Sequence, residues 1–240
     1  MLTPEEMKDK MHEISRKGDY IDSIFNYCDR WCKRCDFTEK CRNYAFNEDA
    51  PPPDGEQIWE YLQNVFKATK LMLEESVENT GLTLEEADKM APAKEPDLSE
   101  NQLYQKSHQL AIEVEEWLKT IIPHQTITES PDQHNPGPVV NEVMEVIQWY
   151  NLFIPAKICR ALSGIEEYPV EEIQTDSNGS AKICLIALDR IIAAWSVLMD
   201  EFPEHQDKIL SILINLAEIR KQAEEVFPNA RKFLRPGFDK

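Results

Sequence analysis

The stretch AKICLIALDRIIAAWSVLM, residues 181–199, is the most apolar segment of the chain. Its apolar residues lie on nearly all sides of a helix, which predicts a helix buried at the centre of the fold. Asp189 and Arg190 interrupt the apolar run, and this indicates a buried helix rather than a membrane span. A polar loop that ends in Asp176-Ser177-Asn178-Gly179-Ser180 is predicted to precede it.

Four more amphipathic helices are predicted in the chain beyond residue 55, because apolar residues recur there at helical spacing. They cover about 58–80, 99–121, 139–162 and 203–226. No run of alternating β-branched residues is long enough to demand a sheet. The predicted fold class is all-α, a helical bundle with an N-terminal helical four-cysteine metal-binding segment.

Two domains are predicted, an N-terminal four-cysteine segment at 1–50 and the bundle at 55–240. Three consecutive prolines at 51–53 mark the division, and further proline-containing loops are expected at 91–96 and 123–138. Thr3-Pro4-Glu5-Glu6 has the residues of a capping box, which predicts a helix start. A second helix is expected to carry three of the cysteines on an apolar stripe, made of Ile21, Phe25, Cys28, Cys32 and Cys35.

The run YCDRWCKRCDFTEKC, residues 27–41, holds four cysteines at the spacing C-x3-C-x2-C-x5-C. These are Cys28, Cys32, Cys35 and Cys41, and only Cys159 and Cys184 occur elsewhere. Clustered thiols that stay reduced are typical of zinc or iron–sulfur sites, so these four are the predicted metal ligands. Basic residues surround them and suit a site of thiolates: Arg30, Lys33, Arg34, Lys40 and Arg42.

The two kinds of metal centre make different demands on this spacing. A single zinc ion holds its four sulfurs roughly 3.8 Å apart. A straight helix separates Cys28 from Cys35 by about 10 Å along its axis, so a zinc site requires the helix to end before Cys35. A 4Fe-4S cluster tolerates sulfurs further apart and suits the spacing somewhat better.

The spacing C-x2-C-x5-C of the last three cysteines is similar to the cluster loop of helix-hairpin-helix DNA glycosylases, over about ten residues. The part C-x3-C-x2-C resembles the radical S-adenosylmethionine signature, but that family needs an α/β barrel. The blocks CDRWCKRC, WYNLFIPAKICRALSG and NGSAKICLIALDR together resemble a set of uncharacterised bacterial helical proteins. This last resemblance spans most of the chain and implies kinship without an activity.

The leading functional hypothesis is therefore a metalloprotein with an iron–sulfur cluster in a redox or electron-transfer role. The alternative is an interaction or adaptor protein in which a structural zinc site staples the N-terminal segment. In a third interpretation the cysteines bind no metal and pack as small apolar side chains, which fits every one of the four except Cys41. Cys159 and Cys184 lie in predicted helices and are expected to be inert core residues.

A second polar set lies on the predicted bundle helices. Lys182, Asp189 and Ser196 recur every seven residues on helix 181–199, and Lys157 and Arg160 lie on a neighbouring helix. Charges in a buried helix are costly unless paired, so Asp189 is predicted to be buried against Lys157, Arg160 or Lys182. A weaker alternative is an enzyme with a cofactor- or anion-binding pocket formed by Lys157, Arg160, Lys182 and Asp189. The Glu-x-x-His signature of di-iron bundles is absent from the sequence.

The net charge of −18 argues against a nucleic-acid partner, because nucleic-acid binding relies on basic residues that neutralise phosphates. The N-terminus has no apolar run of a secretory signal, so a cytoplasmic location without a membrane partner is expected. A redox or protein partner fits the metal hypothesis, while the oligomeric state is open.

Overall fold

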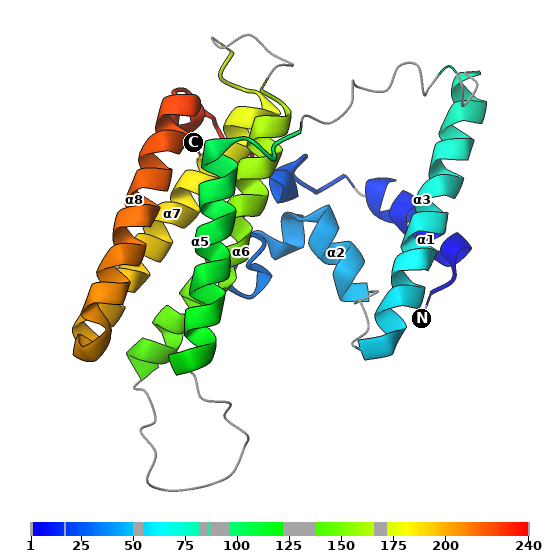
Figure 1. The fold of residues 1–240 in the computed structure, drawn as a ribbon. Helices are drawn as coiled ribbons and strands as arrows, with labels where there is room; N and C mark the ends of the chain where they lie inside the picture. Colours follow the sequence, from blue (N-terminus) through cyan, green and yellow to red (C-terminus); the bar gives the residue numbers. More distant parts are fainter. Residues whose placement is uncertain are drawn as a thin grey trace, which may run out of the picture. The chain divides into compact units, whose positions relative to one another are not determined.

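The computed structural model describes residues 2–16, 18–49, 55–81, 86, 97–121, 138–165 and 172–239. Within these ranges every regular element is a helix, as the predicted all-α class requires (Figure 1). The α-helices are α1 (Pro4–Arg16), α2 (Arg42–Asp49), α3 (Ile58–Thr80), α5 (Gln102–Ile121), α6 (Pro138–Ser163), α7 (Asp176–Glu201) and α8 (Gln206–Val226). The 3-10 helices are η1 (Ile24–Asn26), η2 (Cys32–Arg34), η3 (Thr38–Lys40), η4 (Gly55–Gln57), η5 (Pro203–His205) and η6 (Ala230–Lys232).

Among the described residues, no helix combines the length and the apolar character that crossing a membrane requires. The proline-containing loops predicted at 51–53 and 91–96, and all but the last residue of the loop predicted at 123–138, lie outside the described residues. The helices divide into two compact units. Unit 1 is Met1–Glu95 with Pro236–Lys240, and unit 2 is Pro96–Arg235.

Unit 1 is organised around α1 and α3, whose apolar faces pack together. The capping box predicted for α1 is confirmed: the Thr3 N–H donates to Glu6 Oε2 at 2.8 Å, and the Glu6 N–H donates to Thr3 Oγ1 at 3.2 Å. Met7 of α1 is buried with Tyr61 and Ala68 of α3. Four partly buried residues complete this small core: Leu2, Ile58, Leu62 and Val65.

Unit 2 is a four-helix bundle in which α5 contacts α6 and α8, and α7 contacts the same two helices (Figure 1). The burial predicted for helix 181–199 is confirmed, because Leu185, Leu188 and Trp195 of α7 are fully buried. Among the described helices, α6 and α7 make the most extensive contact.

The predicted polar loop at 176–180 is wrong, since α7 begins at Asp176. Thr175 is its N-cap, and the Asn178 N–H donates to Thr175 Oγ1 at 3.2 Å. The polar residues of this first turn are buried rather than solvated, including Ser177 and Ser180. Tertiary burial therefore extends the helix through residues that, taken alone, favour a turn.

The boundary between the compact units also differs from the predicted one. The sequence division was expected at residues 50–55, but the structure divides the chain between Glu95 and Pro96. The physical reason is that α3 buries its apolar face on α1, so that it completes unit 1 instead of joining the bundle. Residues 236–240 also belong to unit 1, which no sequence pattern had indicated.

A fragment of residues 96–235 is expected to fold alone and to melt cooperatively, because its buried residues contact one another within α5–α8. A fragment beginning at Gly55 carries α3 without α1 and exposes the apolar face formed by Ile58, Leu62 and Val65. This second fragment is expected to be less soluble than the first. Circular dichroism melts of the two fragments test this, and a non-cooperative melt of 96–235 would contradict it.

Candidate metal centre

The backbone that carries the four cysteines is a series of 3-10 turns, so the second helix predicted through Cys35 is wrong. Ser23 and Arg30 adopt left-handed conformations, with φ of 60° and 61°, and each interrupts a right-handed helix. Cys32 begins η2, while Cys35 and Cys41 follow η2 and η3 in extended conformations. The chain therefore folds back on itself instead of spreading the cysteines along one axis.

This folding places all four cysteines around one small pocket. The pocket has a volume of about 20 Å³, and the aromatic residues in its wall include Trp31, Phe37 and Phe238. The Phe37 N–H donates to the sulfur of Cys35 at 3.4 Å, and the Cys28 thiol lies 3.6 Å from the Phe25 carbonyl oxygen. An N–H directed at a sulfur stabilises negative charge on a thiolate. Among the described residues, no group of three or more His, Cys, Asp or Glu side chains has the arrangement of a metal-holding group.

The thiols of the pocket affect one another electrostatically. Burial raises the pKa of Cys32, and the charges of Cys28, Cys41 and Cys35 raise it further. Burial also raises the pKa of Cys28, while the backbone N–H and the charge of Arg30 oppose this shift. Without a bound cation, the close thiols thus favour their neutral form.

Of the basic residues near the cysteines, Arg30 acts on the Cys28 thiol. Arg34 instead lies over the ring of Trp31, 4.1 Å from its centroid. Arg42 pairs with Asp22 at 2.6 Å. The locally basic sequence therefore supplies a cation to the thiols at Arg30, while Arg34 and Arg42 contact a ring and a carboxylate.

One residue at this pocket was missed from the sequence. Phe238 lies almost two hundred positions after the last of the four cysteines, yet it lines their pocket and contacts Phe37 edge to face, with ring centroids 4.9 Å apart. Its only sequence signal is an aromatic residue after Pro236-Gly237, a pair typical of turns. Nothing in that signal specifies which segment the turn contacts.

Different groups contact each of the four charged residues that were predicted to form a second polar set: Lys157, Arg160, Lys182 and Asp189. Arg160 makes a bidentate pair with Asp176, at 2.9 and 2.7 Å. The Lys182 ammonium donates to the Phe233 carbonyl oxygen. Lys157 is buried, and its ammonium lies 5.4 Å from the centre of the Phe153 ring. These contacts lend no support to a shared cofactor- or anion-binding pocket that also includes Asp189.

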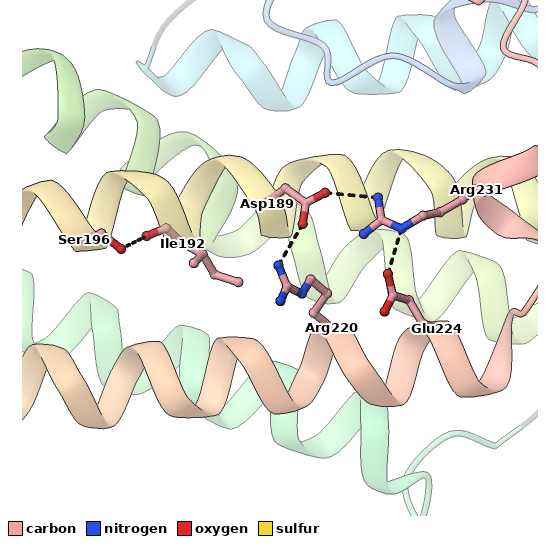
Figure 2. Close-up of polar contacts among 6 residues, drawn as sticks. All are labelled: Asp189, Ile192, Ser196, Arg220, Glu224 and Arg231. Atoms are coloured by element: carbon pink, nitrogen blue, oxygen red, sulfur yellow. Dashed lines mark hydrogen bonds and ion pairs between the residues drawn. The ribbon is translucent and has the colours of Figure 1, made fainter.

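The pairing predicted for Asp189 is wrong in both burial and partner. Its side chain is 41% exposed, and it accepts from Arg220 of α8 and from Arg231 of η6, each at 3.1 Å (Figure 2). Glu224 binds Arg231 from the other side at 2.7 Å. Partial burial acts to lower the pKa of Arg231, but its bonds to Asp189 and Glu224 outweigh this and raise it overall.

The heptad spacing of Lys182, Asp189 and Ser196 did identify one face of α7. Lys182 and Asp189 bind the segment that follows α8. The Ser196 hydroxyl instead donates a hydrogen bond to the Ile192 carbonyl oxygen of the same helix (Figure 2). The partner of Asp189 was expected on α6, at Lys157 or Arg160, or on α7 itself, at Lys182. The apolar face of α7 packs against α6. Its polar face therefore contacts α8 and η6.

Asp189→Asn is expected to lower the free energy of unfolding by about 1 kcal/mol, because the carboxylate joins two arginines but remains partly exposed. Asp200→Asn, an exposed position on the same helix, is the control and should change it by less than about 0.5 kcal/mol. Urea denaturation of both variants measures the difference. A loss of about 3–5 kcal/mol at Asp189 would indicate a buried pair instead.

The remaining cysteines and the histidine near the cluster lie in other surroundings. Cys184 is buried, and burial raises the pKa of its thiol to about 12, with Lys157 opposing the shift. Cys159 is half-buried on α6. His12 of α1 contacts Glu75 of α3, with Nε2 3.1 Å from Oε2, and does not line the cysteine pocket.

Comparisons of the chain with protein-family models, with curated proteins and with solved structures found no match. The geometry of the cysteine pocket is therefore the basis for any statement about function.

Proposed function

We propose that Cys28, Cys32, Cys35 and Cys41 hold one metal centre, and that this centre is the functional element of the chain. The observation that carries the proposal is that all four line a single pocket although they lie on different turns. Four thiolates suffice for a zinc ion or an iron–sulfur cluster. A metal cation also offsets the burial, and the smaller mutual repulsion, that disfavour the thiolate forms of Cys28 and Cys32.

The first candidate is a 4Fe-4S cluster with a redox or electron-transfer role. The spacing C-x2-C-x5-C, similar to a known cluster loop, supports it. The aromatic wall formed by Trp31, Phe37 and Phe238 supports it as well, because limited solvent exposure tunes the potential of such clusters. Bound there, a cluster supplies one-electron chemistry, and the protein supplies ligands, the N–H bond to Cys35 and the apolar surroundings.

A structural zinc site in an interaction protein is the second candidate, and two observations favour it. The pocket volume of about 20 Å³ suits a single ion rather than a cluster. The turns at η2 and η3 also remove the separation along a helix axis that argued against zinc. In this case the ion stabilises residues 20–41, and the function lies in the surface that this segment presents.

An absorption spectrum and a metal assay of anaerobically purified protein distinguish the two candidates. A cluster gives a broad absorption in the visible range together with about four iron and four sulfide per chain. Zinc gives a colourless protein with about one zinc per chain. Protein that contains neither metal, and that fails to bind zinc or accept a reconstituted cluster, would overturn the proposal.

A further inference from the structure

Three residues far from the cysteines in sequence close one side of their pocket. We call Pro236–Phe238 the PGF segment; it belongs to unit 1 with the cysteines. Phe238 lines the pocket and meets Phe37 at an interplanar angle of 72°, the edge-to-face arrangement that aromatic pairs favour. Phe37 lies two residues after Cys35, and its N–H donates to that cysteine's sulfur. The ring of Phe238 thus rests on the residue that orients one of the thiols.

Gly237 makes this close approach possible. Its φ is 79°, a left-handed conformation that favours glycine. A Cβ placed there would lie 2.9 Å from Ile21 Cδ1 and 3.0 Å from Ile24 Cδ1, closer than side-chain carbons approach one another. Ile24 is buried and lies in the turn just before Cys28. The backbone conformation therefore favours glycine at this position, and any larger residue would push the Ile21 and Ile24 methyl groups aside.

The residues just before the PGF segment are held separately, within unit 2. Lys182 donates to the Phe233 carbonyl oxygen, and the Gln174 amide exchanges two hydrogen bonds with the Leu234 backbone, at 3.2 and 2.8 Å. Changes at Gly237 or Phe238 leave these contacts untouched. The effect of the PGF segment on the pocket can accordingly be tested without disturbing the bundle.

We propose that the PGF segment is a cover of the cysteine pocket, and that Phe238 controls the access of small molecules to the thiols and to the metal they hold. The part that concerns metal rests on the proposed function; the part that concerns the thiols does not. The cover acts through the contact of Phe238 with Phe37 and through the close approach of the Gly237 backbone to the Ile21 and Ile24 methyl groups. Opening it requires a local rearrangement of a short segment rather than the unfolding of a unit, so access is slowed rather than prevented.

The first experiment uses the full chain loaded with its metal and mixes it with excess EDTA. Phe238→Ala and Gly237→Ala are each expected to release metal about tenfold faster than the unchanged protein, since an aromatic contact of this kind contributes about one decade. Leu234→Ala, an exposed residue of the preceding segment, is the control and should release metal at the unchanged rate. Equal rates in all four proteins overturn the proposal. Phe238→Ala keeps the glycine, so it stays informative if Gly237→Ala fails to fold.

The second experiment separates this proposal from the metal proposal. Reduced, metal-free full chain is treated with iodoacetamide, and modification at each of the four cysteines is followed by mass spectrometry. Faster modification in Phe238→Ala than in the unchanged protein and Leu234→Ala supports the cover, even if no metal binds. Equal modification rates contradict it, even if metal binds. Failure of the metal proposal appears instead as absence of bound metal in the unchanged protein.

Discussion

Replacing Cys32 or Cys41 with serine is expected to reduce the bound metal from one centre per chain to less than about a tenth of that value. The four cysteines line one pocket, and a hydroxyl is a much poorer ligand than a thiolate for zinc or for cluster iron. Cys32 begins η2 and Cys41 follows η3, so the two variants remove ligands from different turns. Metal content is measured by mass spectrometry of purified protein.

Loss of metal is also expected to destabilise residues 20–41. This segment contains 3-10 turns rather than long helices, and its buried residues are few, with Ile24 and Trp31 among them. Structural zinc contributes on the order of 10–16 kcal/mol of binding free energy to small domains. Limited proteolysis should therefore cut the variants here first. Cys159→Ser, on α6 of unit 2, is the control and should keep both the metal and the resistance. Undiminished metal content in both the Cys32 and the Cys41 variant would contradict the proposed site.

The pH dependence of this site follows from the two resolved thiol shifts. The pKa values of Cys28 and Cys32 are raised above the ordinary 9.0, mainly by burial, so in the metal-free protein these thiols hold their protons at neutral pH. Metal must displace these protons, and its affinity is expected to rise between about pH 6 and about pH 8. Metal-free unit 1 should lose stability as the pH rises above about 9, because the unfolded thiols then release protons before the folded ones do.

Local signals were the parts of the sequence that predicted structure well. The capping box at Thr3 and Glu6 needs only four neighbouring residues, and its two hydrogen bonds formed as expected. The burial of α7 followed from apolar residues on nearly all its sides, which favour a central position in a helical protein. The clustering of the four cysteines around one pocket was likewise predicted from their short spacing.

Choices between partners were predicted poorly. The apolar stripe of α3 fits either α1 or the bundle, and nothing in its sequence distinguishes them. Asp189 had candidate cations on α6 and on its own helix, yet its partners are Arg220 and Arg231, which the seven-residue repeat could not reveal. A periodic pattern specifies which face of a helix is polar but not which neighbour meets it.

The helix predicted through the cysteine segment failed to form for a different reason. Its steps of four and three residues match a helix, but left-handed backbone at Ser23 and Arg30 overrides that periodicity. Neither residue is glycine, so the sequence gives little warning of these turns. Phe238 was missed because its contact with Phe37 spans most of the chain. The meeting of the four cysteines at one pocket thus followed from their short spacing, whereas the wall and the backbone of that pocket did not.

Leu188→Ala is expected to lower the free energy of unfolding of unit 2 by about 2–5 kcal/mol. Leu188 is fully buried at the middle of α7, where α6 and α8 pack against the same helix. Truncation removes apolar contacts and leaves a cavity, because close-packed helices relax only partially around a lost side chain. Urea denaturation of the 96–235 fragment measures the effect without a contribution from unit 1.

Leu210→Ala on α8 is the matched control, since it makes the same chemical change at a residue that is 49% exposed. It is expected to change the free energy of unfolding by less than about 0.5 kcal/mol, because little apolar surface is lost and alanine favours the helix. The difference between the two variants therefore isolates the effect of burial on α7. Similar losses at both positions would mean that Leu210 is also covered, and equally small losses would mean that α7 is not the centre of the bundle.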